Sequence, residues 1–368
     1  MAFFCLFVII IITILFKQAT MSQKKKRRNV LLQFPAILGM VIFAFFSGLR
    51  YNPVIDKDFL NYWEVAKFGN KCIEYERFEI MPKLLADIVQ FFNLPPSAWF
   101  IMAGGLLIFF TMFAASRQKM APLHVVFVGF VLLYLSFDMN VMRQGVALSS
   151  FLCAITYISE KNWKKYLLFA LIALGFHTST ILWTPLYFFS YLHLERRTLF
   201  KLTVIGIASI IAMVSLVYLL SNFGFLFAAV GMESATQAIE KGGAMDMIEK
   251  GSGLGVIIRY LRWFLLFIFI PKIAKKTKDA NLILLFSIFV IGVVMDYFTM
   301  YIMLVVRVSL YPKIVELLLY AYLLRLGNYI YVSKPVENVV RLIVWLQVLF
   351  LSYVTLDYFS GWNFVLKT

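Results

Sequence analysis

Arg143 and Gln144 lie between two apolar runs, residues 125–137 and residues 146–158. We interpret the pair as part of a phosphate site, because a fixed guanidinium can grip phosphate oxygens and a neighbouring amide can add a hydrogen bond. A charge at the edge of an apolar run is costly unless it is paired or hydrated. Two structural interpretations therefore compete with the functional one: Arg143 could snorkel to lipid headgroups, or it could pair with Asp138.

Polar side chains recur at the ends of other apolar runs, and we expect them to face the same side of a membrane. They are Arg50, Asp56, Asp58, Asp138, His177, Arg259, Arg262, Asp296 and Arg307. Guanidinium groups at these positions could neutralise a departing diphosphate, while a carboxylate or an imidazole accepts the proton of an attacking hydroxyl. A substrate that contains both a sugar and a diphosphate would use both kinds of group.

Each of these residues also has a structural interpretation. His177 could be a hydrogen-bonded structural residue, and Asp58 could be a solvated loop acid. Arg259 and Arg262 lie three positions apart on one helical face and could anchor a helix at the membrane surface. Arg307 is harder to explain by structure alone, since it lies about five residues inside an apolar run, too deep for easy snorkelling.

The composition is typical of a protein with many membrane spans rather than of a soluble domain. Hydrophobic residues make up 62% of the chain and charged residues only 15%. The formal net charge of +16 would suggest nucleic acid in a soluble protein. Here the basic residues gather in short segments between apolar runs, so they indicate membrane orientation, and we expect no nucleic-acid partner.

Short clusters of Lys and Arg mark the cytoplasmic ends of the apolar runs and predict about 11–12 membrane segments. The predicted fold class is an all-α polytopic membrane protein, with residues 1–368 forming a single integral domain. Residues 48–80 are expected to form a first external loop, followed by a short interfacial or re-entrant helix at residues 81–92. Residues 221–255 are expected to form a second external loop, which could close as a lid.

Residues 166–191 have two interpretations. They could form one span, or they could form two short helices that meet at residues 176–179, with His177 at the external tip. The split is favoured because it keeps Arg196 and Arg197 on the cytoplasmic side. Short half-helices of this kind are tolerated where protein or a wet cavity covers their ends.

Motifs spread over much of the chain, taken together, resemble the EpsG family of exopolysaccharide and O-antigen polymerases, which are Wzy-like membrane glycosyltransferases. They are Arg-Tyr-Asn and Asp-Phe-x-x-Tyr in residues 50–62, Asn-x-x-Arg-Gln-x-x-Ala in residues 140–147, Phe-His-x-Ser in residues 176–179, and Arg-x-x-x-Tyr in residues 307–311. Residues 53–57 lack the glycine-containing spacer usual in the family. The acid of the first loop is therefore either Asp56 or Asp58, and Asp58 fits the spacing better.

The resemblance implies a polymerase that transfers glycan from an undecaprenyl-diphosphate-linked donor to a lipid-linked repeat unit. It implies transfer without a metal or cofactor, at the external face of the bacterial cytoplasmic (inner) membrane, in a GT-C-like fold. The implied partners are the undecaprenyl-diphosphate-linked oligosaccharide, membrane lipids and a chain-length regulator protein. The implied diphosphate ligands are Arg143, Arg307, Arg50 and Gln144. The implied catalytic residues are Asp58 or Asp56 with His177, and further candidates are Asn140, Tyr62, Arg259 and Arg262.

Two other functions remain open from the residues alone. A flippase for the same lipid-linked oligosaccharide would place charges along a path on both sides of the bilayer midplane, whereas this sequence gathers them toward one face. An O-antigen ligase or a membrane acyltransferase with His177 as base would share the external polar face. The sequence does not predict the sugar, the linkage or the oligomeric state.

Overall fold

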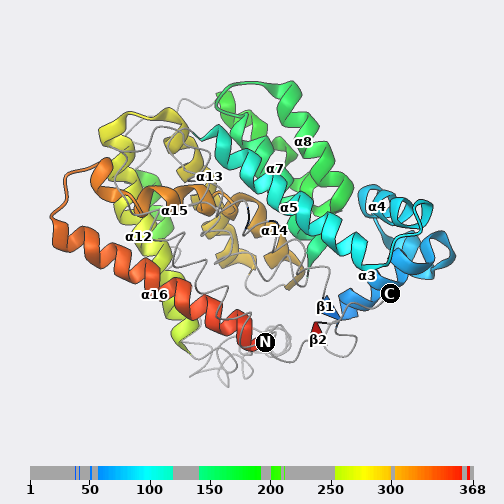
Figure 1. Ribbon diagram of the computed structural model, residues 1–368. Helices are drawn as coiled ribbons and strands as arrows, with labels where there is room; N and C mark the ends of the chain where they lie inside the picture. The colour runs from blue at the N-terminus through cyan, green and yellow to red at the C-terminus, as the bar shows by residue number, and fades with distance from the viewer. Residues whose placement is uncertain are drawn as a thin grey trace, which may run out of the picture. The chain divides into compact units, whose positions relative to one another are not determined.

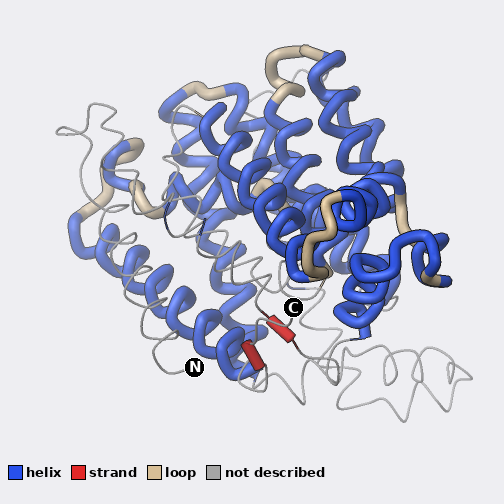
Figure 2. The backbone as a smooth tube through the Cα atoms, turned by 45° about the vertical axis from the view of Figure 1, so that its right-hand side comes forward, coloured by secondary structure: helices blue, strands red, loops and turns tan. Residues whose placement is uncertain are grey.

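The computed structural model describes residues 38, 41, 50–51, 57–118, 141–191, 200–208, 211, 253–299, 303–358 and 363–364. Within these ranges nearly all regular structure is helical, as Figures 1 and 2 show. The exception is an antiparallel pair of two-residue strands, β1 (Arg50–Tyr51) and β2 (Asn363–Phe364). The expected all-α class is therefore confirmed for the described part of the chain.

The chain divides into two compact units. Unit 1 comprises Met1–Ser190, Tyr320–Arg325 and Arg341–Thr368, and unit 2 comprises Tyr191–Leu319 and Leu326–Val340. The single domain expected for residues 1–368 stays a prediction.

Helix α7 (Met142–Thr156) is the central helix of unit 1. It packs on α5 (Ser97–Arg117) and on α8 (Trp163–Phe176). Every residue of α7 except Arg143 is buried, as expected for a helix that is apolar on all sides and surrounded by protein. Arg143 is thus the one residue of α7 whose side chain is partly exposed in the described structure.

Helix α5 is the one described helix that is long and apolar enough to cross a membrane. Its 21 residues extend over about 31 Å, close to the hydrocarbon thickness of about 30 Å. It starts directly after Pro95 and Pro96, which suit a helix start because proline has no backbone N–H to donate. The total of about 11–12 membrane segments and the GT-C-like arrangement stay predictions.

The segment expected as the first external loop contains helices of its own. They are α3 (Lys57–Phe68), η2 (Gly69–Lys71) and η3 (Ile73–Arg77). Helix α4 (Ile80–Phe91) follows where the short interfacial helix was expected. Trp99 on α5 donates from its indole nitrogen to the carbonyl of Pro82 (3.1 Å), which ties α4 to the start of α5.

Helix α4 is amphipathic. Its buried face carries Leu85 and Val89, whereas Ile80, Leu84 and Phe91 are exposed. Exposed apolar side chains along one side of a short helix are typical of helices that lie in a membrane interface.

The polypeptide breaks between α8 and η4, a 3₁₀ helix that spans Thr178–Tyr191. His177 follows the last residue of α8, so the favoured split of residues 166–191 is confirmed at the expected position. The second half is a 3₁₀ helix rather than an α-helix. Its buried residues Thr180, Trp183 and Leu186 recur every three positions, which is the period of a 3₁₀ helix.

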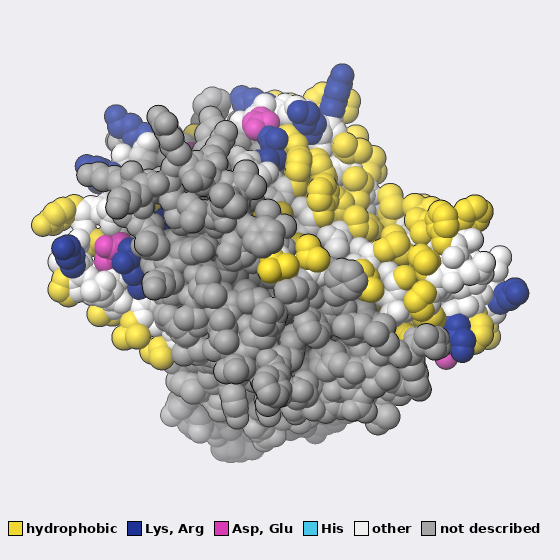
Figure 3. All heavy atoms as spheres, viewed as in Figure 1, with side chains coloured by type: hydrophobic (Ala, Val, Ile, Leu, Met, Phe, Trp, Pro, Cys, Tyr) yellow, Lys and Arg dark blue, Asp and Glu magenta, His cyan; other side chains and the backbone are white. Residues whose placement is uncertain are grey.

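Hydrophobic side chains cover much of the right-hand surface in Figure 3, where α4, α5 and α8 lie in Figure 1. The exposed side chains of α8 and η4 include Leu168, Leu171, Ile181 and Phe188. A broad apolar surface of this kind indicates contact with lipid or with another protein.

Unit 2 is built on α12 (Gly253–Thr277), α13 (Ala280–Thr299) and α14 (Met303–Lys313). In α15 (Glu316–Leu323) the residues up to Leu319 belong to unit 2 and those from Tyr320 on belong to unit 1. Helices α13 and α14 approach closely at Gly292. A Cβ atom there would lie 2.6 Å from Cγ of Lys313 and 2.8 Å from its backbone nitrogen. Lys313 forms a buried ion pair with Asp296, which also accepts a hydrogen bond from Ser309.

The C-terminal part of the described chain contains η5 (Leu326–Asn328) and the long helix α16 (Lys334–Tyr358). Strand β2 then pairs with β1 inside unit 1, with Arg50 opposite Phe364. The Arg-Tyr-Asn motif therefore lies beside the C-terminal segment. Residues 221–252 of the expected lid lie outside the described residues.

Candidate functional site

Arg143 lies in the first turn of α7 and forms an ion pair with Glu79. Its terminal nitrogen Nη1 lies 2.7 Å from Oε2 of Glu79, and the side chains are only 23% and 14% exposed. Glu79 immediately precedes α4. The structure thus pairs Arg143 with the residue that precedes α4, at the end of the segment expected as the first external loop. The partner predicted from the sequence, Asp138, lies outside the described residues.

Two aromatic rings complete the surroundings of Arg143. Its guanidinium carbon lies 4.4 Å from the ring centre of Phe78 and 5.6 Å from that of Tyr62. A guanidinium over an aromatic face gains a cation–π attraction, which is stronger where water is excluded. Aromatic faces and one carboxylate therefore hold the group in a defined orientation.

The second oxygen of Glu79 reaches the segment after His177. Oε1 accepts a hydrogen bond from the backbone N–H of Thr178 at 3.3 Å. The start of α7 and the turn between α8 and η4 therefore meet at one carboxylate. Two of the motifs that carry the family resemblance, one with Arg143 and one with His177, are brought together in this way.

His177 is held by its own turn. Its backbone N–H donates to the carbonyl of Ala173 (3.0 Å), which caps the end of α8. The ring nitrogen Nδ1 accepts from the backbone N–H of Ser179 (3.3 Å) and lies 2.7 Å from the Ser179 hydroxyl oxygen. Because Nδ1 accepts an N–H, the neutral ring carries its proton on Nε2 and can donate from that nitrogen.

Gln144 and Tyr62 are both buried. Gln144 has no exposed surface, so it lies among the packed side chains of unit 1. Tyr62 is stacked on Trp99 with ring centres 5.0 Å apart, and its other neighbours include Arg143 and Phe78. In this arrangement Tyr62 supports Arg143, because its ring is already covered by protein.

The other candidates of the first loop are placed by the backbone. Asp58 lies in the first turn of α3, one helical turn before Tyr62, so both positions share a face of α3. Arg50 lies in β1. Asp56 and Asn140 lie outside the described residues. Asp58 thus stays a candidate acid, four residues before Tyr62, whose ring contacts Arg143.

The remaining candidates lie in unit 2. Arg259 is on α12 and Arg307 is on α14. Arg262 is buried and forms an ion pair with Glu316, which also accepts from the indole nitrogen of Trp263 (3.4 Å). Whether Arg307 joins Arg143 at one ligand stays a prediction.

The sequence interpretation did not assign three charged residues that the structure shows in buried or nearly buried pairs. They are Glu79, Lys313 and Glu316. No local signal identified Glu79, because glutamate is not among the residues preferred before a helix and its side chain makes no capping hydrogen bond. A signal existed for the other two. Lys313 and Glu316 interrupt an apolar run, where charged side chains are usually paired or functional.

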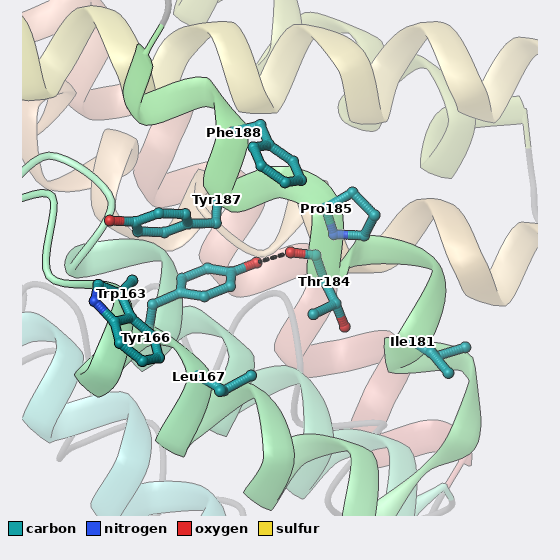
Figure 4. A pocket seen from close by; sticks show the side chains of 8 residues that line it. All are labelled: Trp163, Tyr166, Leu167, Ile181, Thr184, Pro185, Tyr187 and Phe188. Carbon is teal, nitrogen blue, oxygen red and sulfur yellow. Dashed lines mark hydrogen bonds between the residues drawn. The ribbon is translucent and has the colours of Figure 1, made fainter.

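An apolar groove of about 320 Å³ lies between α8 and η4, as Figure 4 shows. Its lining residues are Trp163, Tyr166, Leu167, Ile181, Thr184, Pro185, Tyr187 and Phe188. The Tyr166 hydroxyl donates to the carbonyl of Thr184 at 3.0 Å and so joins the two helices. None of the predicted site residues lines this groove, so it is separate from the Arg143 site.

The described residues offer few ligands for a metal. No group of three or more His, Cys, Asp and Glu side chains in the described part of the chain could hold a metal ion. The polar groups at Arg143 instead suit an anion, because a partly exposed guanidinium and a ring N–H are both donors.

Comparison with known proteins supports the resemblance seen in the motifs. The model of the EpsG family matches residues 33–366, nearly the whole chain. No curated protein and no solved structure matches the chain. Proteins of this family are membrane proteins, and the family suggests a Wzy-like polysaccharide polymerase. The match extends over the segments that hold Arg143, His177 and Arg307, and the chain belongs to the EpsG family.

Proposed function

We propose that the protein is a polysaccharide polymerase of the external face of the bacterial cytoplasmic membrane. It transfers glycan from an undecaprenyl-diphosphate-linked donor to a lipid-linked repeat unit. Beyond family membership, one observation carries the proposal. Arg143 and the turn that follows His177 come from separate motifs, and the Glu79 carboxylate accepts hydrogen bonds from Arg143 and from the backbone N–H of Thr178 in that turn.

Arg143 binds the diphosphate of the donor. Its guanidinium is oriented by Glu79 and by Phe78 before any substrate arrives, and oriented donors stabilise charge that develops as the diphosphate leaves. Arg307 and Arg50 would supply further positive charge. Gln144 would contribute from behind Arg143, since it is buried in α7.

The acceptor hydroxyl attacks the sugar carbon that carries the diphosphate. The new glycosidic bond forms as the bond to the diphosphate oxygen breaks, and the lipid diphosphate leaves with the negative charge. The carboxylate of Asp58, or that of Asp56, accepts the hydroxyl proton. His177 orients the reacting oxygens by donating from Nε2, in accordance with the hydrogen bonds at Nδ1.

The surroundings of this reaction follow from the same proposal. The turn between α8 and η4, which carries His177, would lie at the external face, and α4 would lie in the membrane interface with its exposed Ile80 and Phe91 toward lipid. The GT-C-like architecture would combine such short helices with longer spans. A chain-length regulator would act from outside the site.

The test is polymer formation by the purified protein. Protein in detergent is incubated with its lipid-diphosphate-linked repeat unit, and the products are separated on a ladder gel. We expect a ladder from the wild type and none from Arg143→Ala or His177→Ala. Arg77→Ala is the matched control, because Arg77 belongs to the same loop region and pairs with Glu74, yet its side chain is 72% exposed.

The alternatives give different results. Intact substrate without a ladder, together with movement of the substrate across proteoliposomes, would identify a flippase. A ladder from Arg143→Ala equal to that of the wild type would show that the site lies elsewhere.

A further inference from the structure

Glu79 is the point at which two motif segments meet, and no motif includes it. We infer that Glu79 is a positioning residue of the transfer site, whose two oxygens fix Arg143 and the turn that bears His177. The inference rests on the proposed function. It adds to that function a residue that acts through Arg143 and His177 rather than on the substrate.

The geometry requires a carboxylate. Oε2 accepts from Nη1 of Arg143 at 2.7 Å, and Oε1 accepts from the N–H of Thr178 at 3.3 Å. An amide in place of the carboxylate would offer one oxygen and one NH₂ group. The NH₂ group would then face a donor, so glutamine can satisfy one of the two contacts but not both.

Helix capping does not explain Glu79. The residue occupies the N-cap position of α4, where a side-chain oxygen commonly accepts a backbone N–H of the first turn. The Glu79 side chain makes no such hydrogen bond. Its two oxygens point instead to α7 and to the turn before η4, which are distant in the sequence.

Glu79 also differs from the neighbouring acids of the loop. Glu76 lies 3.8 Å from Lys83 and is 83% exposed, and Glu74 pairs with the exposed Arg77. Exposed pairs of that kind contribute little, because water and salt screen them. Glu79 is mostly buried and its partner Arg143 is also mostly buried, so this pair is screened less.

Two consecutive residues orient the guanidinium. Phe78 covers its face and Glu79 holds one of its nitrogens. Phosphate recognition by arginine depends on the direction of the planar fork, and a misplacement of about 1 Å costs roughly 10²-fold in rate. Removing Glu79 therefore changes where the fork points while leaving its charge in place.

The test separates binding from transfer. Glu79→Ala, Glu79→Gln and the control Glu76→Gln are purified, and folded protein is quantified by size-exclusion chromatography in detergent. Transfer is measured with the lipid-linked repeat unit, and anion binding is measured with farnesyl diphosphate as probe. For each variant kcat is expressed per folded molecule.

We expect kcat of Glu79→Ala to fall roughly 10²-fold. We expect a fall of roughly tenfold for Glu79→Gln, which keeps one hydrogen bond. Farnesyl diphosphate should bind both variants as tightly as the wild type or more tightly, since the charge of Arg143 is no longer neutralised. Arg143→Ala should lose the probe, and Glu76→Gln should match the wild type throughout.

The outcomes are distinct. A wild type without a ladder overturns the proposed function and this inference with it. A wild-type ladder with unchanged kcat in Glu79→Gln overturns the inference alone. Equal losses of probe binding and transfer in Glu79→Gln would also overturn it. So would a loss of transfer that disappears when kcat is expressed per folded molecule. Either result would indicate a purely structural ion pair.

Discussion

Arg143→Lys separates the charge of Arg143 from the shape of its guanidinium. The lysine ammonium keeps the positive charge and can still pair with Glu79. It loses the planar fork and the stacking on Phe78, where the guanidinium carbon lies 4.4 Å from the ring centre. The lost cation–π attraction is worth about 1 kcal/mol at a partly exposed position. The free energy of unfolding should therefore change little.

The transfer rate should change far more. Loss of a donor aimed at the departing diphosphate costs roughly 10²-fold in kcat, which corresponds to about 2.7 kcal/mol of transition-state stabilisation. We therefore expect Arg143→Lys to lose transfer activity roughly 10²-fold while its stability falls by about 1 kcal/mol.

Arg117→Lys is the matched control. Arg117 pairs with Glu160 and lies 3.7 Å from the ring centre of Tyr157, so it combines a carboxylate and an aromatic face as Arg143 does. Arg117 is the last residue of α5, in a segment expected on the cytoplasmic side, away from the proposed site. The same change of shape there should lower stability by a similar amount and leave kcat unchanged.

The assay combines ladder formation with thermal unfolding in detergent for both variants. Equal kcat values for Arg143→Lys and the wild type would refute the assignment, since a point charge would then suffice. Equal losses of rate in Arg143→Lys and Arg117→Lys would refute it as well, since both would reflect stability.

Three further predictions concern the turn and unit 2. His177→Gln should retain at least a tenth of the rate, because its amide N–H can replace the Nε2 donor, and a loss as complete as that of His177→Ala would indicate a base instead. Lys313→Met should lower the free energy of unfolding by about 3 kcal/mol, because it leaves the buried carboxylate of Asp296 without its partner. Adding Asp296→Asn should restore most of this loss, as measured by thermal unfolding. An unaltered unfolding midpoint in Lys313→Met would show that the pair contributes nothing. Gly292→Ala should lower the free energy of unfolding by about 1–3 kcal/mol, because the added Cβ would meet the backbone of α14. The control Gly105→Ala should be neutral, because a Cβ there meets nothing within 4 Å. Similar thermal unfolding midpoints for the two variants would contradict the close approach of α13 and α14.

Apolar periodicity and the placement of charges predicted much of the fold. The all-helical class, a helix near residues 81–92 and the break at His177 are all present in the described residues. Each depends on local features: the length of apolar runs, the amphipathic pattern of α4, and polar residues at an apolar tip. The 3₁₀ form of η4 was not predicted, because 3₁₀ helices longer than one turn or so are uncommon and an apolar run of this length normally indicates an α-helix.

Contacts between distant segments were not predictable in the same way. Arg143 was identified as a residue in need of a partner, yet the partner shown by the structure is Glu79, 64 positions earlier. From the sequence alone, several acidic residues of the same loop were equally plausible partners of Arg143. The packing of α4 on α5 and α8, which in turn pack on α7, selects among them, and that packing has no local signature.

The 3₁₀ geometry of η4 changes how far a short segment can reach. Its 14 residues extend over about 28 Å, because a 3₁₀ helix rises about 2.0 Å per residue. The 14 residues of α8 cover only about 21 Å as an α-helix. An α-helix would need about 19 residues for the distance that η4 covers. The 14 residues of η4, which follow His177, are therefore almost as long as the hydrocarbon layer of a membrane is thick. Deleting one residue would shorten η4 by about 2 Å and rotate its buried face by about a third of a turn.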